Sequence, residues 1–242
     1  SDVYKRQGIY RSPCPPSIPL SELTGCDVFC KLDLLQRTGS FKERGARNAL
    51  LLLGESQKKC GVVAASAGNH ALGLAYHGKL LKIPVTVVMP RFAPLVKVAT
   101  CRRLGANVLL YGETFEEAWQ RAVEIASRDG LRLIHGFDDA EIIAGQGTAA
   151  VEILEDVPDA EAIVVPTGGA GLLAGVAIAA KTQRPDIKII AVEAAAAASF
   201  TASLAAGKPV NAPVRPTLAD GLAVGRVGDR SFALAAPRVD RV

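Results

Sequence analysis

The chain has 242 residues, of which 49% are hydrophobic and 21% are charged, and its formal net charge is +4. This balance is typical of a folded globular protein and excludes a disordered chain. The charge is small and no basic stripe with interleaved aromatic residues occurs, so we expect no nucleic-acid partner. No apolar stretch approaches the roughly 20 residues that span a bilayer, so we expect no membrane partner either.

Short apolar runs alternate with helical stretches along the chain. The runs are rich in Val, Ile and Leu and nearly continuous, as in strands that are buried on both faces. Helices of crossover length between such strands predict parallel sheets. The predicted strands are residues 27–32, 61–65, 85–89, 107–111, 131–134, 162–166 and 187–192.

The helix signals are strongest in the middle of the chain. Thr114 and Glu117 predict a capping box, an apolar face follows, and Gly130 ends the helix. The alanine run 194–198 is expected to begin another helix. Three prolines between positions 209 and 216 predict a long loop.

The two ends of the chain indicate whether it is complete, and its cysteines indicate its cellular compartment. Residues 1–7 are polar and without periodicity, and we expect them to be a non-native tail. Residues 238–242 read as the opening of a strand, so we expect a fragment that stops early. The five cysteines include no CxxC pair, which is typical of reduced thiols and predicts a cytoplasmic location.

The segment 38–46 places a lysine at the start of a predicted helix. Ser40 is the expected N-cap, with Glu43 three residues further on. Lys42 then lies in the first turn, where the helix dipole favours the neutral amine that a Schiff base requires. An ordinary solvated lysine is the alternative.

Two further segments each follow a predicted strand and open a helix, where backbone N–H groups form anion sites. In Ser66-Ala67-Gly68-Asn69-His70, the glycine allows close approach and Asn69 offers its amide, while His70 is expected to cap or pack rather than catalyse. Residues 166–172 contain successive glycines whose N–H groups can bind one phosphate. This segment lacks the Gly-Lys-Ser/Thr ending of a P-loop and does not fit the GxGxxG spacing of a dinucleotide site. A plain turn is the alternative for each.

The carboxyl ends of parallel strands meet at one edge of a sheet, so these segments can converge. A cofactor phosphate would occupy one helix N-terminus and a substrate carboxylate the other. Lys42 would reach an aldehyde between them. The three segments together therefore predict a pyridoxal-phosphate site.

At these residues the sequence resembles the fold-type II pyridoxal-phosphate enzymes, specifically the threonine/serine dehydratases. Motifs 40–46, 66–70 and 168–172 carry the resemblance, and segments 137–139, 144–148 and 219–224 are also similar. The resemblance implies an α/β fold like that of the tryptophan synthase β subunit, with two parallel-sheet, three-layer α/β/α domains. Residues 8–54 and 137–242 would form the larger, cofactor-binding domain, and residues 55–136 a smaller inserted domain.

The resemblance also implies a role for each motif. Lys42 would bind pyridoxal 5′-phosphate as a Schiff base, with Phe41 beside the ring and Asn69 on the ring hydroxyl. The phosphate would be held by the loop of Gly168, Gly169, Ala170, Gly171 and Leu172, and the substrate carboxylate by Ser66, Ala67, Gly68, Asn69 and His70. The implied reaction converts L-threonine or L-serine to a 2-oxo acid and ammonia, so the small-molecule partner is an amino acid substrate. The resemblance also implies a homo-oligomer.

The sequence departs from the family pattern at several positions. Related serine racemases carry a serine where this chain has Ala67, so racemisation is disfavoured. The alanines after Glu193 lack a second carboxylate, so no metal is predicted. Ala170 replaces a frequent glycine, and phosphate binding should persist if its φ is negative. The partner of the pyridine nitrogen would lie beyond Val242. A hydroxyaspartate lyase or a racemase, and a truncated homologue that binds the cofactor or an amino acid without turnover, stay open as alternatives.

Overall fold

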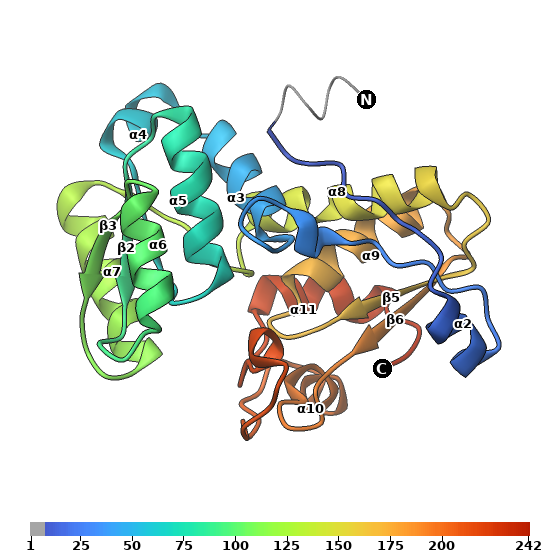
Figure 1. Cartoon of the computed structure of the whole chain (residues 1–242). Coiled ribbons are helices and arrows are strands. Elements are labelled where there is room, and N and C mark those ends of the chain that lie inside the picture. Colours follow the sequence, from blue (N-terminus) through green and yellow to red (C-terminus); the bar gives the residue numbers. More distant parts are fainter. Residues whose placement is uncertain (1–7) are drawn as a thin grey trace.

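The computed structural model describes residues 8–242, so the expected non-native tail lies outside the described residues. Two parallel sheets, each with its own helices, form the molecule (Figure 1). The first has the order β3-β2-β1-β4 and the second pairs β5 with β6. The strands are β1 (Val62–Ala65), β2 (Val85–Met89), β3 (Asn107–Leu110), β4 (Arg132–Leu133), β5 (Ala162–Pro166) and β6 (Lys188–Val192).

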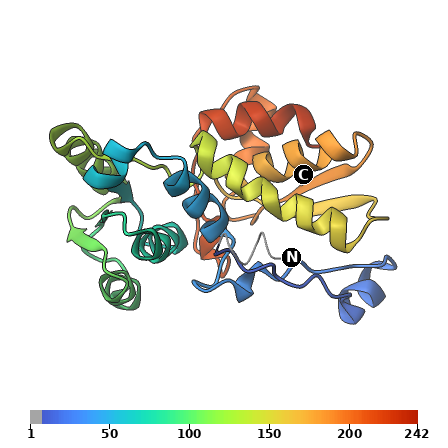
Figure 2. The same cartoon turned by 90° about the horizontal axis from the view of Figure 1, so that it is seen from above.

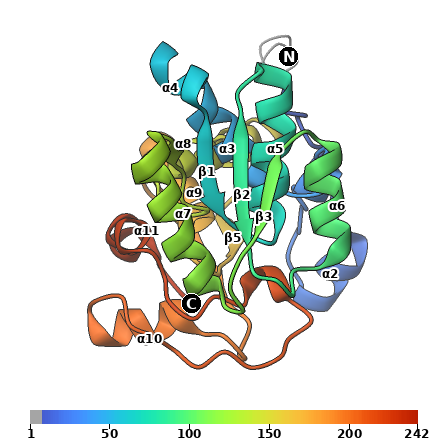
Figure 3. The ribbon, with the colours of Figure 1, turned by 90° about the vertical axis from the view of Figure 1, so that its left-hand side faces the viewer.

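Both faces of the first sheet are covered. Helices α5 (Asn69–Leu81) and α6 (Leu95–Arg103) lie on one side and α7 (Phe115–Asp129) on the other (Figure 3). Alternate residues of β1 and β2 enter the two cores, since Ala64 and Val87 belong to one cluster and Val63 and Val88 to the other. The nearly continuous apolar runs therefore predicted this three-layer unit correctly.

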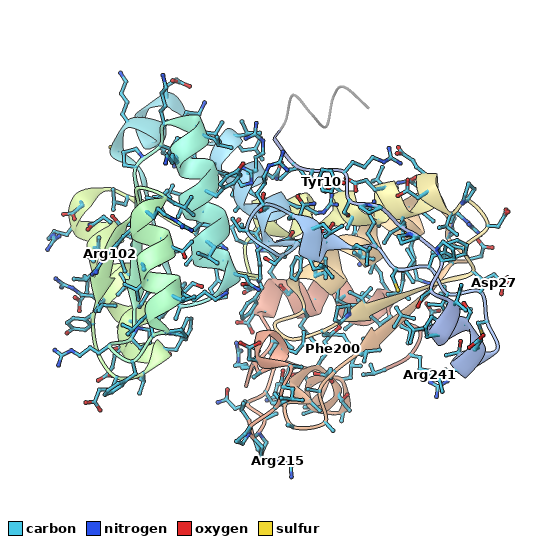
Figure 4. All side chains as sticks on the ribbon, viewed as in Figure 1. Tyr10, Asp27, Arg102, Phe200, Arg215 and Arg241 are labelled. Carbon is cyan, nitrogen blue, oxygen red and sulfur yellow. The ribbon has the colours of Figure 1, made fainter. Side chains whose placement is uncertain are left out.

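The second sheet is buried on one face only. Ile163 and Val165 share a core with residues of α9 (Gly171–Gln183), α10 (Ser199–Ala206) and α11 (Asp229–Ala235). Phe200, labelled in Figure 4, belongs to this core. Val164 is 60% exposed and Val192 is 46% exposed. The expectation of burial on both faces is wrong for β5 and β6, because the described helices cover one side.

Helix α3 (Lys42–Leu51) packs against α5 on one side and against α8 (Ala140–Asp156), which belongs to the second sheet's unit, on the other (Figure 2). The backbones of α3 and α8 touch where glycines face each other, since a Cβ on Gly145 would lie 2.6 Å from the Cα of Gly45. Gly147 and Gly175 allow the same close approach between α8 and α9, because a Cβ on Gly175 would lie 2.7 Å from the nitrogen of Gly147. These glycines set the position of α3, which begins with Lys42.

The predicted capping box of α7 is confirmed, and Gly130 ends the helix in a left-handed conformation. Other local expectations are wrong. Residues 27–32 form no strand and contribute one bridge, between Phe29 and Pro16. Residues 194–198 form no helix, with a turn at residues 195 and 196. Helix α10 begins at Ser199, where the Glu193 carboxylate accepts hydrogen bonds from the N–H groups of Phe200 and Thr201.

The remaining elements are short and flank the two sheets. They are α2 (Ile18–Thr24), η1 (Asp33–Leu35), α4 (Glu55–Cys60), η2 (Asp220–Leu222) and η3 (Ala236–Arg238). The predicted loop around Arg215 has no helix or strand and extends away from both sheets (Figure 4). At the C-terminal end, Arg241 forms a single parallel bridge with Ile190.

The first sheet lies within residues 62–133 and the second within residues 162–192. We keep as a proposal the division into an inserted domain, residues 55–136, and a larger domain of residues 8–54 and 137–242. Within the described residues, no helix combines the length and apolar character needed to cross a membrane.

Candidate active site

Lys42 is the first residue of α3, in the helical turn where the sequence placed it. Its Nζ donates a hydrogen bond of 2.6 Å to the carbonyl oxygen of Gly136. Nζ also lies 5.3 Å from the ring centroid of Phe41 and 5.9 Å from that of Phe137. Burial lowers the pKa of Lys42 to about 8. A neutral amine was expected from the helix dipole, but desolvation is the cause that the structure gives.

The expected N-cap of α3 is wrong. The residue at the N-cap is Phe41, with no side-chain capping bond, because α3 begins two residues after Ser40. The carboxylate of Glu43 instead accepts a hydrogen bond from the backbone N–H of Thr38 and lies 3.2 Å from Nε2 of His77. Glu43 is fully buried, so it ties the turn before Lys42 to α3 and α5.

A buried ion network holds α3 against η1 and α8. The guanidinium of Arg44 bonds both oxygens of Asp33, at 2.6 and 2.9 Å, and both oxygens of Glu152, at 2.7 and 2.8 Å. Lys31 adds a second cation, 2.8 Å from Glu152. These bonds are two bidentate pairs, which fix position as well as charge. The network therefore fixes the helix that carries Lys42.

The predicted carboxylate loop forms the turn between β1 and α5. Gly68 is the N-cap, and its N–H donates to Oγ of Ser66 at 3.2 Å. Asn69 is the first helical residue, and its Oδ1 accepts a hydrogen bond of 2.9 Å from Nζ of Lys97. Gly68 and Asn69 are half-buried, so the loop offers polar groups at the carboxyl edge of the first sheet.

His70 is buried at the start of α5. Its ring is 4% exposed, and Nε2 lies 3.3 Å from the carbonyl oxygen of Ile134. Burial first, and then the charge of Lys42, lower the pKa of His70 to about 3, so the imidazole is neutral at physiological pH. Its Nδ1 is buried without a hydrogen-bond partner among the described residues.

The predicted phosphate loop lies between β5 and α9. The backbone N–H groups of Gly168, Gly169 and Ala170 donate to no acceptor within the described residues. A Cβ on Gly169 would lie 2.4 Å from the ring of Phe137, so that ring packs directly on the glycine backbone. Ala170 has φ +66°, so the negative angle on which its tolerance was made to depend is not the one observed. This conformation disfavours a β-carbon but leaves the N–H in place.

The segment 135–138 joins the candidate groups. Gly136 accepts the bond from Lys42, and Phe137 packs on the glycine loop. His135 shapes the turn, because its Nδ1 accepts the N–H groups of Phe137 and Asp138 at 3.2 and 2.9 Å. Asp138 in turn accepts the N–H of Ser231 at 2.8 Å. The sequence motifs gave no signal for Gly136, His135 or Lys97, whose roles arise from tertiary contacts.

These residues fit a pyridoxal-phosphate cofactor. Lys42 is a desolvated amine whose described hydrogen bond goes to a neutral carbonyl, so no carboxylate holds it as a cation. The glycine loop offers unpaired N–H groups at a helix N-terminus, which is what a phosphate requires. Lys42 bonds Gly136, and the glycine loop packs on the next residue, Phe137.

A family model described as "Pyridoxal-phosphate dependent enzyme" matches residues 5–242. The chain belongs to this family. An L-threonine ammonia-lyase from Thermotoga maritima is 47% identical over 97% of this chain and 58% of the relative, and one from Geobacter sulfurreducens is 44% identical over 100% and 60%. The chain therefore spans about three fifths of these curated relatives.

Solved structures of the pyridoxal-phosphate enzymes match the fold closely. The processed form of threonine deaminase isoform 2 from Solanum lycopersicum superposes with a TM-score of 0.93 at 42% identity, over 98% of this chain and 69% of that one. A serine racemase from Dictyostelium discoideum matches with a TM-score of 0.92 at 36% identity, over 100% and 78%. The α/β fold expected from the resemblance is thereby confirmed.

Proposed function

We propose that the chain is the cofactor-binding and catalytic part of an ammonia-lyase that acts on L-threonine or L-serine. One observation carries the proposal. The Nζ of Lys42 lies 2.6 Å from the carbonyl oxygen of Gly136, and the next residue, Phe137, packs on the glycine loop. The relatives named L-threonine ammonia-lyase, at 44% and 47% identity, support this substrate class.

The proposed roles follow from the chemistry of the groups. Lys42 would hold the cofactor, beside Phe41. The N–H groups of the 168–172 loop would hold its phosphate, and Asn69 would donate to the ring hydroxyl. The turn of residues 66–70 would bind the substrate carboxylate through the N-terminus of α5.

When bound, the cofactor supplies an electron sink that stabilises a carbanion at Cα. The chain must supply the base that removes the Cα proton. Lys42 Nζ suits that task, because burial lowers its pKa to about 8 and a base works best when its pKa is near the working pH. His70 suits it poorly, since a pKa of about 3 makes the imidazole a weak base.

The residue at position 67 favours elimination over racemisation. Racemisation needs a second proton donor on the opposite face of the substrate, and the loop carries Ala67, whose methyl group has no exchangeable proton. Although a serine racemase is among the similar structures, we therefore propose a lyase.

We propose further that the chain works in the cytoplasm as a homo-oligomer. Its five cysteines, Cys14, Cys26, Cys30, Cys60 and Cys101, are all free, which suits a reducing compartment. Exposed apolar residues of α2, among them Ile18 at 70% and Leu23 at 80%, are suited to a contact with a second copy.

The test is product analysis with the cofactor-loaded chain. L-threonine should yield 2-oxobutanoate and L-serine should yield pyruvate, and threo-3-hydroxyaspartate tests the related lyase. Lys42→Ala should abolish the product, whereas Lys59→Ala, on the exposed surface of α4, should not. Cofactor binding without any oxo acid would contradict the lyase, and D-serine as main product would favour a racemase.

A further inference from the structure

Lys97 contacts the candidate site from outside the motifs. It is the third residue of α6, and its Nζ donates a hydrogen bond of 2.9 Å to Oδ1 of Asn69, 28 positions earlier. Both residues are half-buried. Among the described hydrogen bonds, Lys97 is the one side-chain cation that contacts residues 66–70.

The bond decides which way the Asn69 amide points. An amide can rotate to present either its oxygen or its NH₂ group, and the two orientations have the same shape. A lysine ammonium has three donors and no acceptor, so it can bond only the oxygen. With Oδ1 held by Lys97, the NH₂ group is left to donate elsewhere.

We propose that Lys97 is a positioning residue that fixes Asn69 as a hydrogen-bond donor toward the cofactor, through the amide orientation it enforces. The inference rests on the proposed function and deepens it. The acceptor is the ring oxygen of the cofactor, which is electron-rich and would be repelled by an amide oxygen. Without Lys97, the amide is free to present the wrong group.

The charge of Lys97 supports the same assignment. His70, the other titratable group of this turn, is neutral because it is buried. A cation on Lys97 therefore polarises the Asn69 amide and strengthens the donor on its far side, as chains of hydrogen bonds do. A purely structural role, tying α6 to α5, would use the same bond, and its loss would lower the melting temperature rather than cofactor affinity.

The experiment is a double-mutant cycle on the full chain, with Lys97→Met, Asn69→Ala and the combined variant. Titration of the apoprotein with pyridoxal phosphate gives the dissociation constant, and turnover of L-threonine gives KM and kcat separately. Lys97→Met should raise the dissociation constant about tenfold, the loss expected for one charge-assisted hydrogen bond. It should change kcat less than about threefold, since the lysine does not touch the reacting atoms.

Two further variants complete the design. Lys97→Arg also has only donors, so it should restore most of the affinity, whereas the matched control Lys59→Met should equal the wild type. Lys97→Gln replaces Lys97→Met if the methionine variant melts at a clearly lower temperature. In the Asn69→Ala background, removing the lysine should change cofactor affinity less than about twofold, because the lysine acts through the amide.

The outcomes separate the inference from the function on which it rests. Wild-type affinity in the Lys97 variants, or losses that multiply in the double variant, would overturn the positioning role while the function stands. Failure of the wild-type chain to bind the cofactor more tightly than Lys42→Ala would overturn both.

Discussion

Removing the buried guanidinium of Arg44 should destabilise the protein more than any surface change. Arg44 is 2% exposed and makes bidentate pairs with Asp33 and Glu152, and Glu152 is fully buried. Arg44→Met would leave the carboxylates of Asp33 and Glu152 close together, and that of Glu152 out of contact with solvent. Breaking a buried ion pair from one side costs about 3–5 kcal/mol. Since Lys31 remains 2.8 Å from Glu152, we expect the lower end, about 3 kcal/mol.

The assay is the free energy of unfolding from urea titration. Arg44→Lys keeps the charge but cannot form both bidentate pairs, so it should lose part of the stability. Arg128→Met removes an ion pair with Asp129 in which both side chains are largely exposed, and should leave the free energy of unfolding close to that of the wild type. A loss below about 1 kcal/mol in Arg44→Met would refute the reasoning, because the network would then contribute no more than a surface pair.

Three further predictions follow from the helix packing, the glycine loop and the amine. Gly145→Ala should destabilise by about 1–3 kcal/mol, because its Cβ would lie 2.6 Å from the backbone oxygen of Arg44, whereas Gly221→Ala, with nothing within 4 Å, should cost far less. Ala170→Gly should raise the free energy of unfolding by about 1 kcal/mol, because φ is +66°, and a decrease measured by urea titration would contradict this. The rate of cofactor capture by the apoprotein, followed by absorbance, should rise with pH through a one-proton midpoint near 8, because only the neutral amine of Lys42 attacks, and a midpoint near 10.5 would contradict the burial argument.

The sequence predicted the first sheet because periodicity and burial agree there. Val62, Val63, Ala64 and Ala65 are all buried, which is the pattern of a strand between two helix layers. The same reasoning failed at Val164, which is 60% exposed, because the composition of a strand does not reveal which faces its neighbours cover. Residues 27–32 failed similarly, since an apolar run pairs only where a partner strand is in reach.

The candidate site was predictable in its motifs but not in its connections. Local signals placed Lys42 and Asn69 at helix starts, and both are there. Glu43 looked like a capping residue, but its carboxylate bonds to Thr38 and approaches His77, a contact made 34 positions away. Lys97 carried no signal, because its role depends on how α6 packs beside α5.

The central claim is that Lys42 holds the cofactor, and one chemical capture tests it directly. The chain is incubated with pyridoxal phosphate, reduced with borohydride and digested, and the modified peptide is identified by mass spectrometry. The account predicts that the added mass lies on Lys42 and is absent from Lys42→Ala. A stable adduct on another lysine, or none at all, would contradict it.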